Sequence, residues 1–169
     1  MANPMYGQNK FDNAIDNAKE NIIVTVAATT LTAAQSGATV LHQVAAAALT
    51  LPAAKAGLNF KIVLGIASTS GCNILTASNA DCFFGVIPIS SSGTDDQTGI
   101  AQILTHAVAI AAPASYDAMK FVAATATIGG LAGECIWLTA VDDTAWYVSI
   151  PYHATSHADP GDCALIVAR

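Results

Sequence analysis

The amino-acid sequence predicts an all-β fold, an antiparallel β-sandwich or barrel-like domain preceded by a short N-terminal arm or helix. From residue 22 onward, short β-branched or alternating apolar runs are separated by turns rich in Gly, Pro, Ser and Asp. Residues 21–54 contain no Asp, Glu, Lys or Arg, which indicates strands covered by a core or by other copies of the chain. Crossover helices are not evident between the runs, so parallel βαβ units are not predicted.

Residues 1–20 differ from the rest of the chain and are predicted to form a separate arm. They hold two of the six Lys and Arg, three of the twelve Asp and Glu, and four Asn. Phe11, Ile15 and Ala18 share one face at helical spacing, which predicts a short helix after an extended start. This segment is either an arm that docks on a neighbouring subunit or a frayed terminus. Residues 21–169 are predicted to be one β-rich domain.

Short strands fill the first half of this domain. Residues 22–26 are mostly β-branched, and residues 59–64 alternate Phe, Ile and Leu on one face with Lys61 on the other. The four alanines at 45–48 are too few to nucleate a helix, so they are assigned to a tight strand or turn. The remaining predicted strands of this half are residues 39–44, 49–51, 73–76 and 82–89.

The second half begins with the clearest loop, residues 90–96, which are all polar or Gly. Residues 100–110 fit either a strand or a short helix. A strand is predicted at 119–123, and the Gly-rich segment 129–133 ends it. A last strand is predicted at 163–168.

The strongest local pattern is a β-hairpin near the C-terminal end. Strands at 135–141 and 145–150 flank the short acidic turn 142–144. Adjacent strand residues point to opposite faces, so one ring of the Trp146-Tyr147 pair should point inward and the other toward the surface.

The composition favours a protein that works by assembly. Hydrophobic residues make up 53% of the chain and charged residues 11%, less than half of the roughly 25% typical of soluble domains. Aromatic residues are only 7%, so most apolar side chains are small. A surface with so few charges promotes association, and we expect neighbouring subunits to cover part of it.

Charge and hydropathy exclude several partner classes. The net charge is −6, and six Lys and Arg, no two of them adjacent, cannot form a phosphate-neutralising stripe, so no nucleic-acid partner is expected. Uncharged spans are interrupted by polar residues and Pro, so no membrane partner is expected. The start of the chain lacks the basic and apolar regions of a secretion signal, which predicts a protein made in a cytoplasm.

The four cysteines, Cys72, Cys82, Cys135 and Cys163, show no zinc-ligand spacing. In a reducing compartment they are expected to be buried free thiols. Cys72 and Cys82 flank a turn-rich segment, so a disulfide between neighbouring strands is the alternative.

The histidines provide one weak metal-site pattern. His153, His157 and Asp159 fall within seven residues, and such residues can ligate zinc. Pro151 and Pro160 flank them, however, and disfavour the helix that would align the two imidazoles. A solvated loop is therefore preferred, and no metal site is predicted.

Catalytic patterns are equally weak, so the chain is predicted not to be an enzyme and to need no cofactor. The Ser-Gly pairs are turn dipeptides, and no G-x-S-x-G motif is present. The acidic pairs 95–96 and 142–143 occupy turns, where carboxylates are usually solvated. His42 and His106 lie alone in apolar runs and are expected to have partners in the core or at an interface.

Three segments carry a resemblance to a known class of proteins: LTAAQSG at 31–37, LTLPAAKAGLNFKIVLG at 49–65 and GECIWLTAVDDTAWYV at 133–148. Together they resemble small structural proteins of tailed bacteriophages and are most similar to capsid decoration, or cement, proteins. The opening MANPMYGQNK is similar to the start of such proteins from marine phages and cyanophages. The high alanine content and the four cysteines depart from this pattern.

The resemblance implies a β-rich, commonly trimeric virion protein that binds the outer surface of the capsid and clamps neighbouring major capsid proteins. Its partners would be the major capsid protein and further copies of itself as a homotrimer. An N-terminal arm often contacts the shell in this family, so Asn3, Pro4, Tyr6 and Phe11 are the expected contact residues.

Two other functions remain open at this point. Tail-fibre and receptor-binding modules of phage virions share the L-T-L-P…A-G pattern, although this chain lacks the internal repeat of a fibrous shaft. A glycan hydrolase would need two carboxylates facing each other across a cleft.

Overall fold

The computed structural model describes residues 21–68, 72–91, 98–121, 132–150, 154–155 and 165–168. Among these residues, strands form two mixed sheets and the helices are short, so the all-β prediction is confirmed. The predicted arm and its expected contact residues, Asn3, Pro4, Tyr6 and Phe11, lie outside the described residues.

The larger sheet has eight strands. Its path from edge to edge is β1 (Ile22–Thr25), β3 (Thr39–His42), β5 (Asn59–Leu64), β10 (Cys135–Ala140), β11 (Ala145–Ser149), β7 (Cys82–Ser91) and β12 (Ala154–Thr155). Strand β8 (Thr98–Leu104) pairs with β7 beside this path. The predicted hairpin β10–β11 forms as expected and lies in the middle of the sheet.

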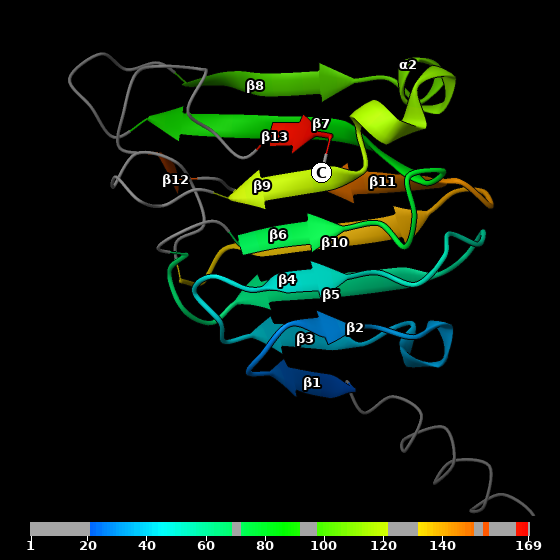
Figure 1. The fold of residues 1–169 in the computed structure, drawn as a ribbon. Helices are drawn as coiled ribbons and strands as arrows, with labels where there is room; N and C mark the ends of the chain where they lie inside the picture. The colour runs from blue at the N-terminus through cyan, green and yellow to red at the C-terminus, as the bar shows by residue number, and fades with distance from the viewer. Residues whose placement is uncertain are drawn as a thin grey trace, which may run out of the picture.

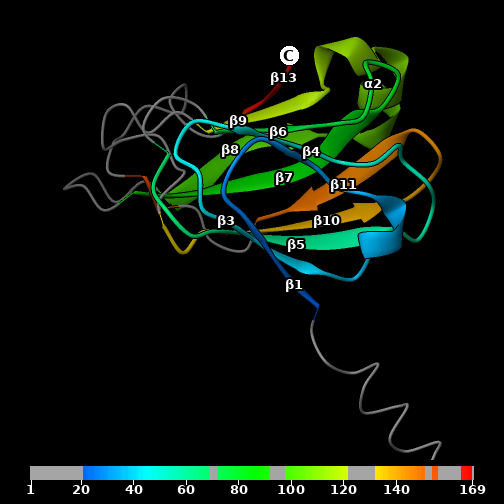
Figure 2. The same cartoon turned by 60° about the horizontal axis from the view of Figure 1, so that its bottom comes forward.

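The smaller sheet has five strands and lies over the larger one (Figures 1 and 2). Its order is β13 (Leu165–Val167), β9 (Ala118–Phe121), β6 (Cys72–Leu75), β4 (Ala48–Thr50) and β2 (Thr29–Thr30). The two-residue strand β2 was not predicted from the sequence, because two residues are too short for a period-2 pattern.

The prediction of an antiparallel arrangement is wrong for the first half of the chain and for the pairing of β11 and β12 with β7, which is also parallel. Strands β1, β3 and β5 are parallel to one another, and so are β2, β4 and β6. The chain alternates between the two sheets, so each crossover between parallel neighbours passes through a strand of the opposite sheet (Figure 1). Parallel strands need a long crossover, and here a strand replaces the helix whose absence argued against parallel pairing.

The core fills the space between the sheets. Along β3, β5 and β10 alternate residues point inward, and the buried side chains form one cluster. The largest of them, Trp146, is fully buried and lies with its ring centroid 6.1 Å from that of Phe60. Other inward side chains with at most 1% exposure include Val40, Leu49, Ile62, Ile74, Met119 and Leu138.

The helical segments are short and local. The ambiguous residues 100–110 contain both predicted structures, because β8 ends at Leu104 and helix α2 (His106–Ala111) follows, with η2 (Pro113–Ser115) after it. The turn η1 (Ala33–Gln35), which was not predicted, is closed by a capping box with Thr32. In the described part of the chain, none of the helices has the length and hydropathy needed to cross a bilayer.

The cysteines confirm one expectation and correct another. Cys72 and Cys82 are buried free thiols, and burial raises the pKa of each to about 11. They lie in β6 and β7, which belong to different sheets, so they do not face each other on neighbouring strands. Cys135 is only half-buried, which differs from the expected full burial, and Cys163 lies outside the described residues.

Candidate functional site

The outward face of the larger sheet carries the most distinctive described surface. Its strands place one residue each in a continuous cross-strand row, in the order Ile22, Thr39, Lys61, Trp137, Ser149 and Val86. Of the large hydrophobic side chains whose exposure the structure describes, none that is exposed belongs to β2, β4, β6 or β9 of the smaller sheet. The two outer surfaces therefore differ in kind.

One end of this face is apolar. Ile22, Val24, Val26 and Ile66 are 61%, 54%, 74% and 47% exposed, and we call this group the apolar edge. The ladder continues beyond the strands, because Gln43 N–H donates to Thr25 O and Gly65 N–H to His42 O. These bonds bring the segments that hold Val26 and Ile66 to the same end of the sheet.

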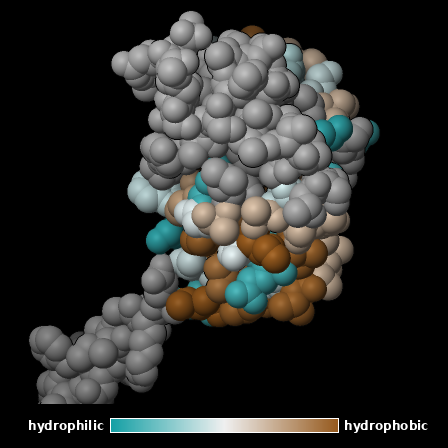
Figure 3. All heavy atoms as spheres, turned by 90° about the vertical axis from the view of Figure 1, so that its left-hand side faces the viewer, coloured by the Kyte–Doolittle hydropathy of each residue, from teal (hydrophilic) through white to brown (hydrophobic). Residues whose placement is uncertain are grey.

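The apolar edge includes the side chains of a terminal strand. In the described sheet β1 pairs only with β3, so its other side is a strand edge. In Figure 3 the described surface at the height of β1, β3 and β5 is largely hydrophobic. An exposed edge with apolar side chains is a template for association with another chain.

Beyond the apolar edge, the face contains a shallow groove of about 340 Å³. It crosses β3, β5 and β10 and is lined by Gly37, Ala38, Thr39, Asn59, Phe60, Lys61, Trp137, Leu138 and Thr139. Lys61 is the one charged residue in this lining. The groove therefore combines an aromatic ring, hydroxyl and amide groups and a single cation.

The Trp137 ring has a defined orientation. It is 50% exposed, and its Nε1 donates a hydrogen bond to Cys135 Sγ at 3.1 Å. Residues two apart on a strand share a face, so this bond tilts the indole along β10. The sequence contains the signal for its exposure, because Trp137 alternates with the inward Ile136 and Leu138.

Further aromatic rings extend the face away from the groove. Tyr147 is 40% exposed whereas Trp146 is buried, so the prediction of one inward and one outward ring is confirmed. Tyr147 pairs with Thr139 and is therefore a diagonal neighbour of Trp137, a separation that aromatic side chains can bridge. Phe84 lies 5.4 Å from the Tyr147 ring, and His106 meets Phe84 edge-on at 4.9 Å.

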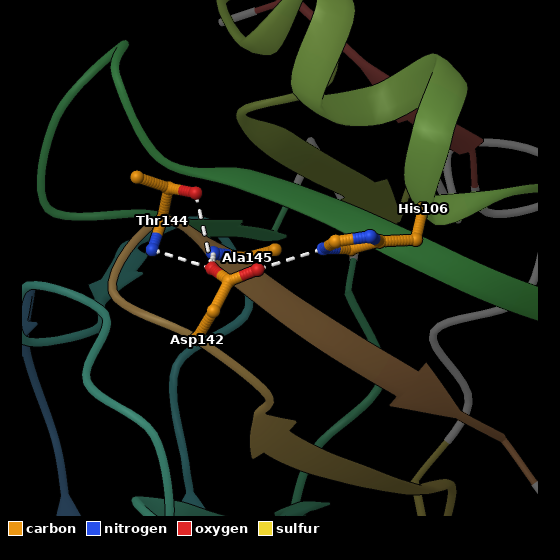
Figure 4. Close-up of polar contacts among 4 residues, drawn as sticks. All are labelled: His106, Asp142, Thr144 and Ala145. Atoms are coloured by element: carbon orange, nitrogen blue, oxygen red, sulfur yellow. Dashed lines mark hydrogen bonds and ion pairs between the residues drawn. The ribbon is translucent and has the colours of Figure 1, made fainter.

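A polar cluster at the end of this aromatic row joins α2 to the hairpin turn (Figure 4). His106 Nε2 lies 2.8 Å from Asp142 Oδ2. Asp142 Oδ1 accepts bonds from Thr144 N–H at 2.7 Å, Ala145 N–H at 2.7 Å and the Thr144 hydroxyl at 3.0 Å. Burial alone would raise the pKa of Asp142, but these bonds and His106 together lower it below its ordinary value.

The His106–Asp142 pair corrects the interpretation of the turn acids as simply solvated. The two residues are 36 positions apart, so spacing in the sequence carried no signal for the pair. His106 does have a partner, as expected, although both side chains are about 40% exposed. The nearby Thr144 hydroxyl donates to the carboxylate, whereas a nucleophile in a catalytic triad would bond to the imidazole. The described geometry is that of a clamp between two elements.

The remaining candidate residues fall outside the described chain or form no site within it. His153, His157, Asp159, Asp95 and Asp96 are not described. Across the ranges that the structure describes, no group of three or more His, Cys, Asp or Glu residues could hold a metal ion.

Comparisons with known proteins complete these observations. No protein-family model, no curated protein and no solved structure matches this chain.

Proposed function

We propose that this chain is a non-enzymatic structural protein of a bacteriophage virion, which binds the outer surface of the capsid and stabilises the shell by clamping major capsid proteins. The observation that carries the proposal is the apolar edge, where Ile22, Val24 and Val26 on and directly after the terminal strand β1 are 54% to 74% exposed and Ile66, after β5, is 47% exposed. Contiguous exposed apolar groups of this kind mark interaction sites.

The position of the apolar edge supports a role for the preceding segment. β1 begins at Ile22, two positions after the end of residues 1–20, so Asn3, Pro4, Tyr6 and Phe11 belong to the segment that leads into the apolar edge along the chain. Four side chains alone are too few for a stable interface, which needs about 800 Å² per partner. The arm and repeated contacts within a lattice would supply the rest, because linked sites raise effective concentration.

The proposal includes two finer structural statements. The two stacked sheets and their common core favour a β-sandwich over a closed barrel, because the larger sheet retains β1 at an edge. A homotrimer would bury part of the charge-poor surface, since a closed assembly covers the same patch on every subunit.

The apolar edge can be tested by substitution. We expect the double variant Ile22→Ser, Val24→Ser to bind decoration-free phage heads at least about tenfold more weakly, a loss of roughly 1.4 kcal/mol. The matched control is Val108→Ser, Ile110→Ser on α2, whose side chains are 48% and 46% exposed. Sedimentation of labelled protein with heads measures binding. Equal binding by both double variants and the unaltered protein would contradict the proposal.

The Trp137 groove also favours a second candidate, a tail-fibre or receptor-binding module, because such modules need a ligand-binding face. Electron microscopy of virions labelled at the C-terminus separates the two. Label spread over the head supports the decoration protein, and label confined to the tail supports the receptor-binding module.

A further inference from the structure

We propose that the groove beside Trp137 binds a saccharide, with a pyranose ring stacked on the exposed indole and a preference for sugars that carry a carboxylate. This inference goes beyond attachment to a shell and does not depend on it, because the groove lining and the apolar edge share no residue, although Thr39 of the lining pairs with Ile22.

The aromatic ring supplies the first requirement of a sugar site. Trp137 is 50% exposed and its Nε1 is bonded to Cys135 Sγ, so the ring is held before a ligand arrives. A π-face is electron-rich, and the C–H groups on one side of a pyranose are weakly positive and apolar. A pre-oriented ring loses less entropy on binding than a mobile one.

The polar lining supplies the second requirement. The Thr139 hydroxyl and the Asn59 amide line the same groove as the indole. Asn59 Nδ2 donates to Gly57 O at 3.3 Å, and the amide oxygen and the hydroxyl can accept hydrogen bonds from sugar hydroxyls. Lys61 pairs in register with both Thr39 and Trp137, so the two residues flank it in the cross-strand row. As the single charge of the lining, it favours a carboxylate such as that of a uronic acid.

The size of the groove suits a small ligand. A volume of about 340 Å³ is within the range of small-ligand sites, roughly 300–1,000 Å³. Tyr147, 40% exposed and diagonal to Trp137, offers a second ring for a neighbouring sugar unit. A short oligosaccharide therefore fits the arrangement better than a single sugar.

The test uses two hexasaccharides of matched length. Hyaluronan hexasaccharide carries glucuronic acid, and chitohexaose is uncharged. We expect hyaluronan hexasaccharide to bind several-fold more tightly in isothermal titration. It should also protect the tryptophan fluorescence from acrylamide, because Trp137 is exposed whereas Trp146 is buried.

Variants assign the binding to the groove. Trp137→Ala should weaken hyaluronan binding at least about tenfold, and Thr139→Val, which keeps the side-chain shape, should weaken it less. Lys61→Gln should remove the preference for the charged hexasaccharide. Val108→Ser, on α2, is the control and should bind as the unaltered protein does.

The outcomes are distinguishable from those for shell attachment. Trp137→Ala should still bind phage heads, and the Ile22→Ser, Val24→Ser variant should still bind hyaluronan hexasaccharide. Absence of binding by both hexasaccharides at millimolar concentration, or full binding by Trp137→Ala, would overturn the site. Equal affinity for the two hexasaccharides would overturn the role of Lys61.

Discussion

At the scale of single residues, His42 shows how a polar side chain is accommodated in this core. It is 1% exposed, and its Nε2 lies 3.2 Å from the carbonyl oxygen of Ala47. A carbonyl only accepts, so Nε2 carries the proton and the Thr25 hydroxyl, 2.6 Å away, donates to Nδ1. Both ring nitrogens of the neutral imidazole are therefore satisfied.

This arrangement predicts a pH dependence of stability. Burial lowers the pKa of His42 from its ordinary value of 6.5, despite the opposing bond to Ala47. Below about pH 6.5 the His42 imidazole binds a proton more readily in the unfolded chain than in the folded one. The free energy of unfolding should therefore be highest above pH 6.5 and fall as the pH decreases below it. Urea unfolding between about pH 7.5 and pH 5 measures the change. His42→Gln should give a flatter profile, and an equally steep one would contradict this origin.

Gly85 provides a second prediction at this scale. Its φ is +145°, and an added Cβ would lie 2.2 Å from the carbonyl oxygen of Val148 on the paired strand β11. Gly85→Ala should therefore lower the free energy of unfolding by about 3 kcal/mol or more. Gly57→Ala is the matched control, because φ is +94° but no atom lies within 4 Å, so only about 1–2 kcal/mol is expected. Chemical denaturation measures the free energy of unfolding of both variants. Similar decreases for the two would contradict the role of the Val148 carbonyl and show that the positive φ alone causes the destabilisation.

At the scale of elements, the contact between α2 and the β10–β11 turn depends on one carboxylate. Helix α2 has only six residues, too short to be stable alone. The bond from His106 to Asp142 ties its first residue to the hairpin, and Asp142 also closes the turn through Thr144 and Ala145. One side chain thus orders two elements.

Two substitutions separate these roles. Asp142→Asn keeps an acceptor for the turn but loses the charge, and should cost about 0.5 kcal/mol because the pair is exposed. Asp142→Ala also loses the turn acceptor and should cost about 1 kcal/mol more. The pKa of Asp142 is lower in the folded protein than in the unfolded chain. Its contribution to the free energy of unfolding is therefore present at pH values above the unfolded pKa and is lost as the pH falls through the folded pKa. Thermal unfolding at neutral and acid pH measures both effects. Identical losses for the two variants would contradict the separate role of the turn.

The same scale shows how far patterns predict elements. Alternating apolar residues predicted β5 at Asn59–Leu64 with its observed bounds and the hairpin of β10 and β11 within one residue at each end. Periodicity depends only on which face of a strand is buried. It contains no information on strand direction, so the parallel pairing of β1, β3 and β5 could not be predicted.

At the scale of the whole molecule, the two outer surfaces differ in chemistry. The larger sheet exposes aliphatic side chains at the β1 end and aromatic rings on β10 and β11, whereas strands β2, β4, β6 and β9 of the smaller sheet expose no large hydrophobic side chain. A protein that contacted partners through both surfaces equally would not need this asymmetry. We therefore infer that its partners meet the larger sheet.

This asymmetry predicts self-association. The purified chain should self-associate, because a closed assembly buries exposed apolar groups that a monomer leaves in water, and the resemblance to decoration proteins implies a homotrimer. Light scattering coupled to size exclusion measures the mass. The Ile22→Ser, Val24→Ser variant shows whether the apolar edge is part of the subunit interface. A monomer at every concentration tested would contradict the prediction.

The sequence by itself determined which segments form strands and which strand residues turn inward, because burial of alternate apolar side chains is a local pattern. It also indicated the charge-poor surface. Only the tertiary structure decided which strands are neighbours, and hence the apolar edge, the groove and the His106–Asp142 pair. Each of these joins residues from different strands or loops. Their proximity depends on sheet order and register, which arise from contacts between distant parts of the chain.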